Sequence, residues 1–197
     1  MISTTTVSRR DKGKDNRREE STRGRSGPSR ATARSLLVVN GWTLLFWTAF
    51  RDRWTAMREA ARDARDADPI GYIHTPEVKF FRTVRDLIFK EIPANPDHPQ
   101  FRQGKTLGRA HTHWRRAKFH RRFRLFFRFH TASRTIIYAW LNDEHTLRKA
   151  GSETDPSAVF HRMLERGAPP SDWDALIQAC EAVSGDASNG DTLDESR

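Results

Sequence analysis

Cysteine is almost absent from this sequence, since Cys180 is the only one in 197 residues. A single thiol excludes a disulfide framework and any metal site built from several cysteines. Long apolar runs are also missing, because no stretch approaches the ~18 consecutive apolar residues that span a membrane. The first residues lack the apolar segment of a secretory signal. These absences together predict a soluble, cytoplasmic protein.

Positive charge is plentiful but unevenly distributed, within a formal net charge of +10. Residues 1–35 carry +6, residues 36–100 are neutral, residues 101–150 carry +11 and residues 151–197 carry −7. A basic region of this density favours a polyanionic partner, most often nucleic acid. A merely solvated basic surface would have the same composition.

Composition also divides the chain into three parts. Residues 1–35 are rich in Ser, Thr, Arg and Gly with almost nothing to bury, which predicts a disordered basic arm. Residues 36–184 are long enough for one domain with its own core. Residues 185–197 are predicted to be a disordered acidic tail.

Three successive strands are predicted over residues 114–119, 122–129 and 135–141, because aromatic and β-branched residues alternate there with polar ones. A further short strand is expected at residues 37–39. The strand pattern makes this region the centre of an antiparallel sheet.

Four helices are predicted around the sheet. Apolar residues at helical spacing predict a helix over residues 46–66, and Thr75 is the expected N-cap of a second helix. Two more are expected to begin at Asp155 and Ser171, the last with Cys180 on its buried side. The fold class is therefore α+β, with two N-terminal helices covering the apolar face of a small sheet.

Side chains of the two predicted strands 114–119 and 122–129 separate by parity into two faces. The odd positions of the second strand are apolar and are expected to face the core. The even positions of both strands are mostly basic: Trp114, Arg116, Lys118, Arg122, Arg124, Phe126 and Arg128.

This basic face suits phosphate, because guanidinium groups bind phosphate bidentately and stay charged. A cluster around one phosphodiester would stabilise the five-coordinate state formed when a ribose 2′-hydroxyl attacks phosphorus. Neighbouring cations would favour the neutral form of Lys118, which could then act as a base. Trp114, Phe126 and Tyr138 are candidates to stack on unpaired bases. Phosphate binding without cleavage explains the pattern equally well.

Two other motifs are too incomplete to predict a cofactor. His111-x-His113 offers two imidazoles, whereas a zinc site needs three or four ligands. Gly104-Lys105-Thr106 lacks the first glycine of a phosphate-binding loop and follows no parallel strand. No metal or organic cofactor is expected.

Six motifs occur in order between about Val38 and Ala182. They are Asn40-Gly41-Trp42, Phe101-Arg102-x-Gly104-Lys105-x-Leu107-Gly108, Lys118-Phe119, Arg122-x-Arg124-Leu125-Phe126-Phe127-Arg128, Trp140-x-Asn142-Asp143-Glu144-x-Thr146-Leu147-Arg148 and Arg166-Gly167-x-Pro169-Pro170-x-Asp172-Trp173. Together they resemble the YhaV family of bacterial type II toxins, within the RelE superfamily. One departure is the turn between Phe119 and Arg122, which is one residue shorter than the family pattern.

The resemblance implies a RelE-like fold and an endoribonuclease toxin that cuts mRNA, with or without the ribosome, and arrests growth. It also implies an antitoxin of the PrlF type, a swapped-hairpin DNA-binding protein, through which alone operator DNA would be contacted. A catalytically inactive relative that acts in operon repression is the alternative.

The resemblance and the basic face together imply catalytic or RNA-binding roles for individual residues. Glu144 or His145 is the expected proton carrier, the latter because histidine titrates near neutrality. The expected catalytic residues are Arg116, Lys118, Arg124, Glu144, His145 and Arg148. The expected RNA-binding residues are Lys105, Trp114, Arg122, Phe126 and Arg128.

Overall fold

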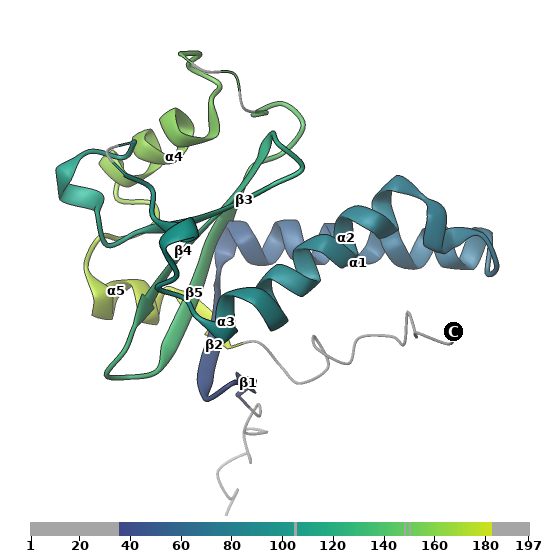
Figure 1. Cartoon of the computed structure of the whole chain (residues 1–197), viewed down its shortest axis with the longest axis horizontal. Coiled ribbons are helices and arrows are strands. Elements are labelled where there is room, and N and C mark those ends of the chain that lie inside the picture. The colour runs from purple at the N-terminus through teal and green to yellow at the C-terminus, as the bar shows by residue number, and fades with distance from the viewer. Residues whose placement is uncertain (1–35, 105, 148, 150, 183–197) are drawn as a thin grey trace, which may run out of the picture. The chain divides into compact units, whose positions relative to one another are not determined.

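The computed structural model describes residues 36–104, 106–147, 149 and 151–182. The predicted basic arm, the acidic tail and the roles predicted for Lys105 and Arg148 therefore lie outside the described residues. Within them the chain forms an α+β domain in which helices lie on both sides of a sheet (Figure 1).

The sheet has six strands in the order β1-β2-β5-β4-β3, with β6 also pairing with β2. Pairing is antiparallel except between β2 and β5, which are parallel. The strands are β1 (Val38–Val39), β2 (Trp42–Trp47), β3 (Arg115–Phe119), β4 (Phe123–His130), β5 (Thr135–Leu141) and β6 (Cys180–Ala182).

The three central strands agree with the predicted ranges to within a residue, but two strands were not predicted. β2 occupies Trp42–Trp47, so the first helix begins at Thr48 rather than at residue 46. The prediction that Cys180 lies on a helix is wrong, because the last helix ends at Gln178 and Cys180 pairs with Trp47 in the sheet. Both errors arise because pairing with distant segments, rather than local pattern, makes β2 and β6 strands.

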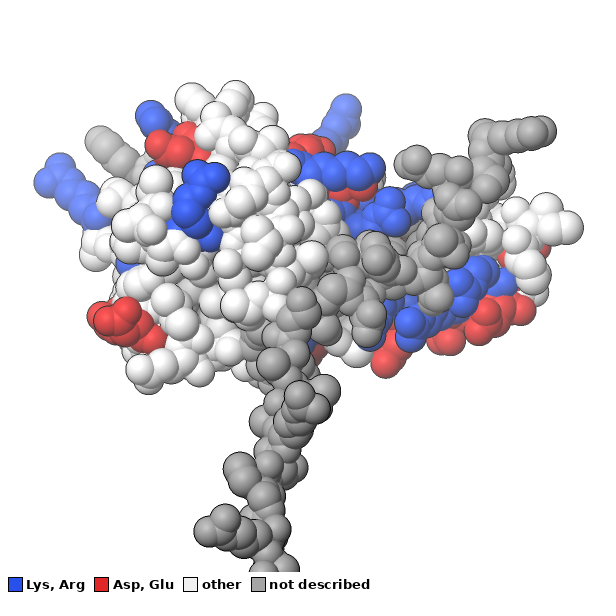
Figure 2. All heavy atoms as spheres, turned by 90° about the horizontal axis from the view of Figure 1, so that it is seen from below, with Lys and Arg blue, Asp and Glu red and all other residues white. Residues whose placement is uncertain are grey.

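The long helices are α1 (Thr48–Ala67) and α2 (Pro76–Asp86), which are followed by a π-helical turn (Leu87–Glu91) and α3 (Ile92–Ala94). Short 3-10 turns occur at Tyr72–His74, Pro99–Phe101 and Arg109–His111. Thr75 caps α2 as predicted, since its side chain accepts a hydrogen bond from the Val78 amide. Figure 2 shows basic and acidic side chains interspersed along these helices, as on an ordinary solvated surface.

The C-terminal helices are α4 (Pro156–Glu165) and α5 (Trp173–Gln178). Asp155 caps α4 as predicted. The cap of α5 is Asp172 rather than Ser171, because its carboxylate accepts the hydrogen bond from the Ala175 amide at 2.9 Å. These two helices lie on the side of the sheet opposite α1 and α2 (Figure 1).

Each face of the sheet is packed into its own hydrophobic cluster. On one face, Leu125 and Phe127 of β4 pack with Tyr138 and with side chains of α1 and α2. On the other face, Trp114 and Phe126 pack with side chains of α4 and α5. The parity predicted for β4 is therefore correct, but its basic face is not an open surface, because helices cover part of it.

These two clusters overturn the predicted stacking roles of three aromatic residues. Trp114, Phe126 and Tyr138 are all completely buried. The Phe126 ring stacks on Phe160 of α4 with centroids 4.2 Å apart, and the Tyr138 hydroxyl donates a hydrogen bond to the Ile88 carbonyl at 2.7 Å. Burying a large apolar side chain contributes about 1.5–3 kcal/mol to stability. These rings form the core and do not reach an RNA base.

Candidate active site

A cavity of about 460 Å³ lies where the β3–β4 hairpin meets the start of α4. We call it the basic pocket. Its lining residues come from the loop before β3, from β3 and β4, and from the start of α4: Thr106, Arg116, Lys118, Arg124, Gly151, Asp155 and Ser157. The structure thus brings together three of the six predicted catalytic residues.

Strand register explains why the three cations meet. Lys118 of β3 is paired directly with Arg124 of β4, and Arg116 lies two residues before Lys118 on the same face. Side chains at such positions stand side by side. Lys118 is exposed, whereas Arg116 and Arg124 are buried, with relative exposures of 9% and 6%.

Neutral oxygen atoms hold the two buried guanidinium groups in place. Arg116 donates a hydrogen bond to the Ser157 hydroxyl at 3.1 Å. Arg124 donates to the carbonyls of Phe123 and Arg121 at 2.6 and 3.1 Å. These contacts fix the orientation of both groups in advance, which is what preorganised stabilisation of a developing charge requires.

The beginning of α4 also lines the pocket, and it brings one carboxylate, that of Asp155. Asp155 accepts a hydrogen bond from the Ser157 amide at 2.9 Å, and Pro156 occupies the first helical position. The amino end of a helix favours anions, and here the carboxylate of Asp155 already occupies that position. Arg116, Lys118 and Arg124 outnumber this one carboxylate in the lining of the pocket and form a site suited to a phosphate group.

Sequence reasoning missed Thr106, Gly151, Asp155 and Ser157 as members of this site. Asp155 was identified only as the start of a helix, since a capping motif says nothing about what the helix end faces. The contact between Arg116 and Ser157 joins positions 41 residues apart, and no local pattern indicates it.

The turn after β5 is held against the β3–β4 hairpin by Asn142, which is completely buried. Its side-chain oxygen accepts a hydrogen bond from the Arg124 amide at 2.6 Å. Its side-chain nitrogen donates to the carbonyls of Thr146 and Arg122 at 2.9 and 3.3 Å. Asn142 therefore fixes the backbone of Arg124 and the course of residues 143–146.

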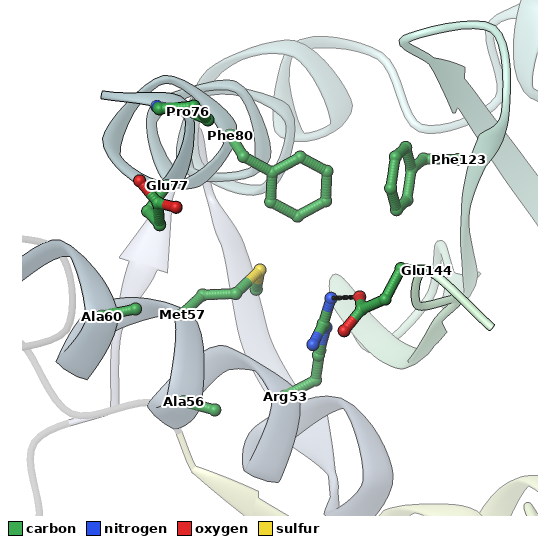
Figure 3. Close-up of a pocket in the computed structure, with 9 residues that line it drawn as sticks. All are labelled: Arg53, Ala56, Met57, Ala60, Pro76, Glu77, Phe80, Phe123 and Glu144. Carbon is green, nitrogen blue, oxygen red and sulfur yellow. Dashed lines mark hydrogen bonds and ion pairs between the residues drawn. The ribbon is translucent and has the colours of Figure 1, made fainter. Parts of the chain in front are cut away.

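The structure does not bring Glu144 into the basic pocket. Glu144 lines a second cavity of about 450 Å³ and forms an ion pair with Arg53 of α1 at 3.1 Å (Figure 3). A hydrogen bond from its own backbone amide, opposed by partial burial and assisted by Arg53, lowers its pKa. A carboxyl group that is ionised near neutrality is poorly suited to donate a proton. His145 is exposed and lines neither cavity.

The residues predicted to bind RNA are dispersed. Arg128 donates a hydrogen bond to the Ser171 carbonyl at 2.8 Å and lies over the Trp173 ring, 5.0 Å from its centroid, so it holds α5 on the sheet. Arg122 is exposed in the turn before β4. Trp114 and Phe126 are core residues.

Within the part of the chain that the structure describes, no cluster of three or more His, Cys, Asp and Glu side chains is placed to hold a metal ion. None of the described helices is long and apolar enough to cross a membrane.

Comparison with known proteins gives consistent matches. The family model Toxin_YhaV, described as a toxin with endonuclease activity of a toxin-antitoxin system, matches residues 44–181. Toxin YhaV of Escherichia coli O6:H1 (strain CFT073) is 40% identical over 145 residues, which are 73% of this chain and 94% of that protein. Ribonuclease toxin YhaV of Escherichia coli K12 is 39% identical with the same coverage. No solved structure matches.

Proposed function

This chain belongs to the YhaV toxin family, as a toxin with endonuclease activity of a toxin–antitoxin system, and we propose that the basic pocket is where it cleaves RNA. One observation carries this proposal. Arg116, Lys118 and Arg124 converge with the amino end of α4 in a single cavity. The proposed substrate is mRNA, whose cleavage would arrest growth.

The proposed reaction is attack by the ribose 2′-hydroxyl on the neighbouring phosphorus. Arg116 and Arg124 bind the non-bridging oxygens and stabilise the charge that grows on them. Lys118, in its neutral form, accepts the proton of the 2′-hydroxyl. A bond forms between the 2′-oxygen and phosphorus, and the bond to the 5′-oxygen breaks. The 5′-oxygen takes a proton from water and leaves as a hydroxyl.

The chemistry of the product ends tests this mechanism. Purified protein is incubated with bare mRNA and excess chelator, with and without ribosomes. We expect fragments with a 2′,3′-cyclic or 3′-phosphate on one side and a 5′-hydroxyl on the other. Deoxyribose at the cut site should stop cleavage, because the attacking group is then missing. Cleavage that ends when the chelator is added, or 5′-phosphate products, would contradict 2′-hydroxyl attack.

The same assay addresses the alternative of a catalytically inactive relative that acts in operon repression. Such a protein would bind RNA or its antitoxin and leave every phosphodiester intact. Arg116 and Arg124, oriented by fixed oxygen acceptors, favour the catalytic function.

The partners are an antitoxin and an RNA substrate, because the family is part of a toxin–antitoxin system. We infer an antitoxin of the PrlF type, contact with operator DNA only through its complex, and action in the cytoplasm. We also infer a RelE-like fold. The β3–β4–β5 antiparallel meander, with α1 and α2 packed against one face, supports that inference.

A further inference from the structure

The second cavity, which we call the apolar pocket, is nearly equal in volume to the basic pocket but opposite in chemistry. It lies between α1, α2 and the start of β4 (Figure 3). Its lining is mostly apolar, with three charged side chains: Ala56, Met57, Ala60, Pro76, Phe80 and Phe123, together with Glu77 and the ion pair of Arg53 and Glu144. A mostly apolar cavity of this size with a few polar groups is typical of sites that bind small molecules.

Two aromatic rings and one ion pair determine which kind of ligand the apolar pocket could bind. The rings of Phe80 and Phe123 lie 4.6 Å apart between centroids, and both are partly exposed. Figure 3 shows these rings and the sulfur of Met57 facing the same space, beside the Arg53–Glu144 pair. Aromatic side chains with a few polar groups are what single-stranded RNA bases stack on and hydrogen-bond with.

The two pockets are built on the same short piece of backbone. Phe123 lines the apolar pocket and the next residue of β4, Arg124, lines the basic pocket on the opposite face. Asn142 accepts a hydrogen bond from the Arg124 amide, and Glu144 follows it two residues later at the wall of the apolar pocket. The two pockets lie on opposite faces of the sheet here, so one RNA strand that occupies both has to cross the end of the β3–β4 hairpin.

We propose that the apolar pocket binds a nucleobase of the RNA strand close to the scissile phosphate, and that guanine is the base it selects. This role rests on the proposed function of the basic pocket. Guanine presents two N–H donors beside a carbonyl acceptor. The Glu144 carboxylate can accept from the two N–H groups, and the Arg53 guanidinium can donate to the carbonyl. The Arg53–Glu144 pair is partly exposed and opens at little cost.

A segment of the antitoxin is the rival occupant, because an apolar pocket can also receive a protein side chain. The shared backbone of Phe123 and Arg124 favours RNA, since it joins this pocket to the phosphate site. The experiment below separates the two occupants.

The first test fills the pocket without removing any contact. Ala56 is an exposed position of α1 that lines the pocket, so Ala56→Phe places a ring in it. Ala67→Phe is the matched control, because Ala67 is exposed at the end of the same helix and does not line the pocket. Cleavage sites are mapped by sequencing the fragments of a randomised RNA pool. We expect the wild type and Ala67→Phe to prefer guanine at one position near the cut, and Ala56→Phe to lose at least about tenfold of that preference.

The second test uses the chemistry of the base and a conservative variant. Inosine lacks the exocyclic amine of guanine, so replacing that guanine with inosine should slow cleavage by the wild type. Glu144→Gln should abolish most of the difference between guanine and inosine, because the amide lacks the second acceptor oxygen. This readout is a ratio of rates within one variant and does not depend on how much of the protein is folded.

Two results would overturn the proposal. One is an unchanged guanine preference in Ala56→Phe together with an unchanged guanine-to-inosine ratio in Glu144→Gln. The other is a retained preference in Ala56→Phe with lost inhibition by the antitoxin, which would make the pocket a protein site. Failure of the proposed function is visible separately, because Arg124→Ala would then cleave the same pool at the rate of the wild type.

Discussion

Arg124 and Arg128 stand on the same face of the same strand, four residues apart, and have different surroundings. Arg124 is held by backbone carbonyls at the edge of a cavity that a phosphate could enter. Arg128 donates to the Ser171 carbonyl and lies over the Trp173 ring, beneath α5. One arginine lines a pocket, whereas the other joins two elements of the fold.

The difference comes from what covers the sheet at each end of β4. The start of α4 approaches β3 with its capped amino end, and a cavity lined by Arg116, Lys118 and Arg124 is left between them. At the other end, α5 packs directly on the strand through an aromatic ring. Two arginines on the same face of β4 therefore have different surroundings, and the sequence pattern of the strand does not distinguish them.

The largest expected effect distinguishes these two arginines by activity. Arg124→Ala should reduce the rate of RNA cleavage about 100- to 1000-fold, because the loss of one preorganised contact to a developing charge costs ~2.7–4 kcal/mol. Arg128→Ala should retain nearly full activity in the same assay at a temperature where both are folded. Equal losses of cleavage rate in the two variants would contradict the conclusion that Arg124 lines the pocket and Arg128 only holds α5.

A smaller loss of activity is expected where α4 contacts the pocket. Ser157→Ala removes the hydroxyl that accepts a hydrogen bond from Arg116. We expect cleavage at saturating RNA to fall about tenfold, since one hydrogen bond to a charged group contributes about 1.5–3 kcal/mol and part of it is replaced by water. Ser157→Thr keeps a hydroxyl and should recover most of the rate. Failure of threonine to recover it would indicate a packing defect instead.

For the free energy of unfolding we expect the opposite order, with Arg128→Ala more destabilising than Arg124→Ala. Arg128→Ala removes a hydrogen bond to the Ser171 carbonyl and a contact with the Trp173 ring. We expect the free energy of unfolding to fall by about 1 kcal/mol, and Tm by about 2–4 °C for a domain of this size. Thermal unfolding measured by circular dichroism checks this. An unchanged Tm would show that α5 is held by other contacts.

The smallest effect concerns the pH dependence of stability near Arg128. Burial, followed by the charge of Arg128, lowers the pKa of His113 from 6.5 to about 4. The unfolded chain therefore binds this proton at a higher pH than the folded chain does, and stability falls as pH drops from 6.5 towards 4. His113→Asn should reduce this loss, and Arg128→Ala should reduce it less, as denaturant titrations at several pH values would reveal. An identical pH profile in His113→Asn would contradict the shift.

The elements that depend on local pattern could be predicted from the sequence. The three central strands follow from alternation, and the caps Thr75 and Asp155 follow from side chains that accept hydrogen bonds from their own helices. The convergence of Arg116, Lys118 and Arg124 was also predictable, because parity and a hairpin are sufficient to bring them together.

What lies on top of those strands could not be predicted. Phe126 is buried against Phe160, and Arg116 donates a hydrogen bond to Ser157. Both partners lie on α4, a helix that alternation in β4 does not locate. The separation of Glu144 from the cations of the basic pocket has the same origin, because Arg53 on α1 pairs with it across 91 residues. The direction in which each side chain of a strand points follows from its local sequence. Which helix packs on top of the strand depends on segments far away in the chain.

The parallel pairing of β2 with β5 also affects the order in which the sheet can form during synthesis. Thr43 pairs with Thr135, so β2 leaves the ribosome roughly 90 residues before its partner strand exists. At about 5–20 residues per second, this interval lasts on the order of 5–20 s, and the start of α4 is made later still. The basic pocket is completed only after Ser157 has been made, because the residues that line it extend to that position. If that pocket cleaves RNA, the messenger that encodes this toxin is protected from its own nascent product until translation of the domain is nearly finished.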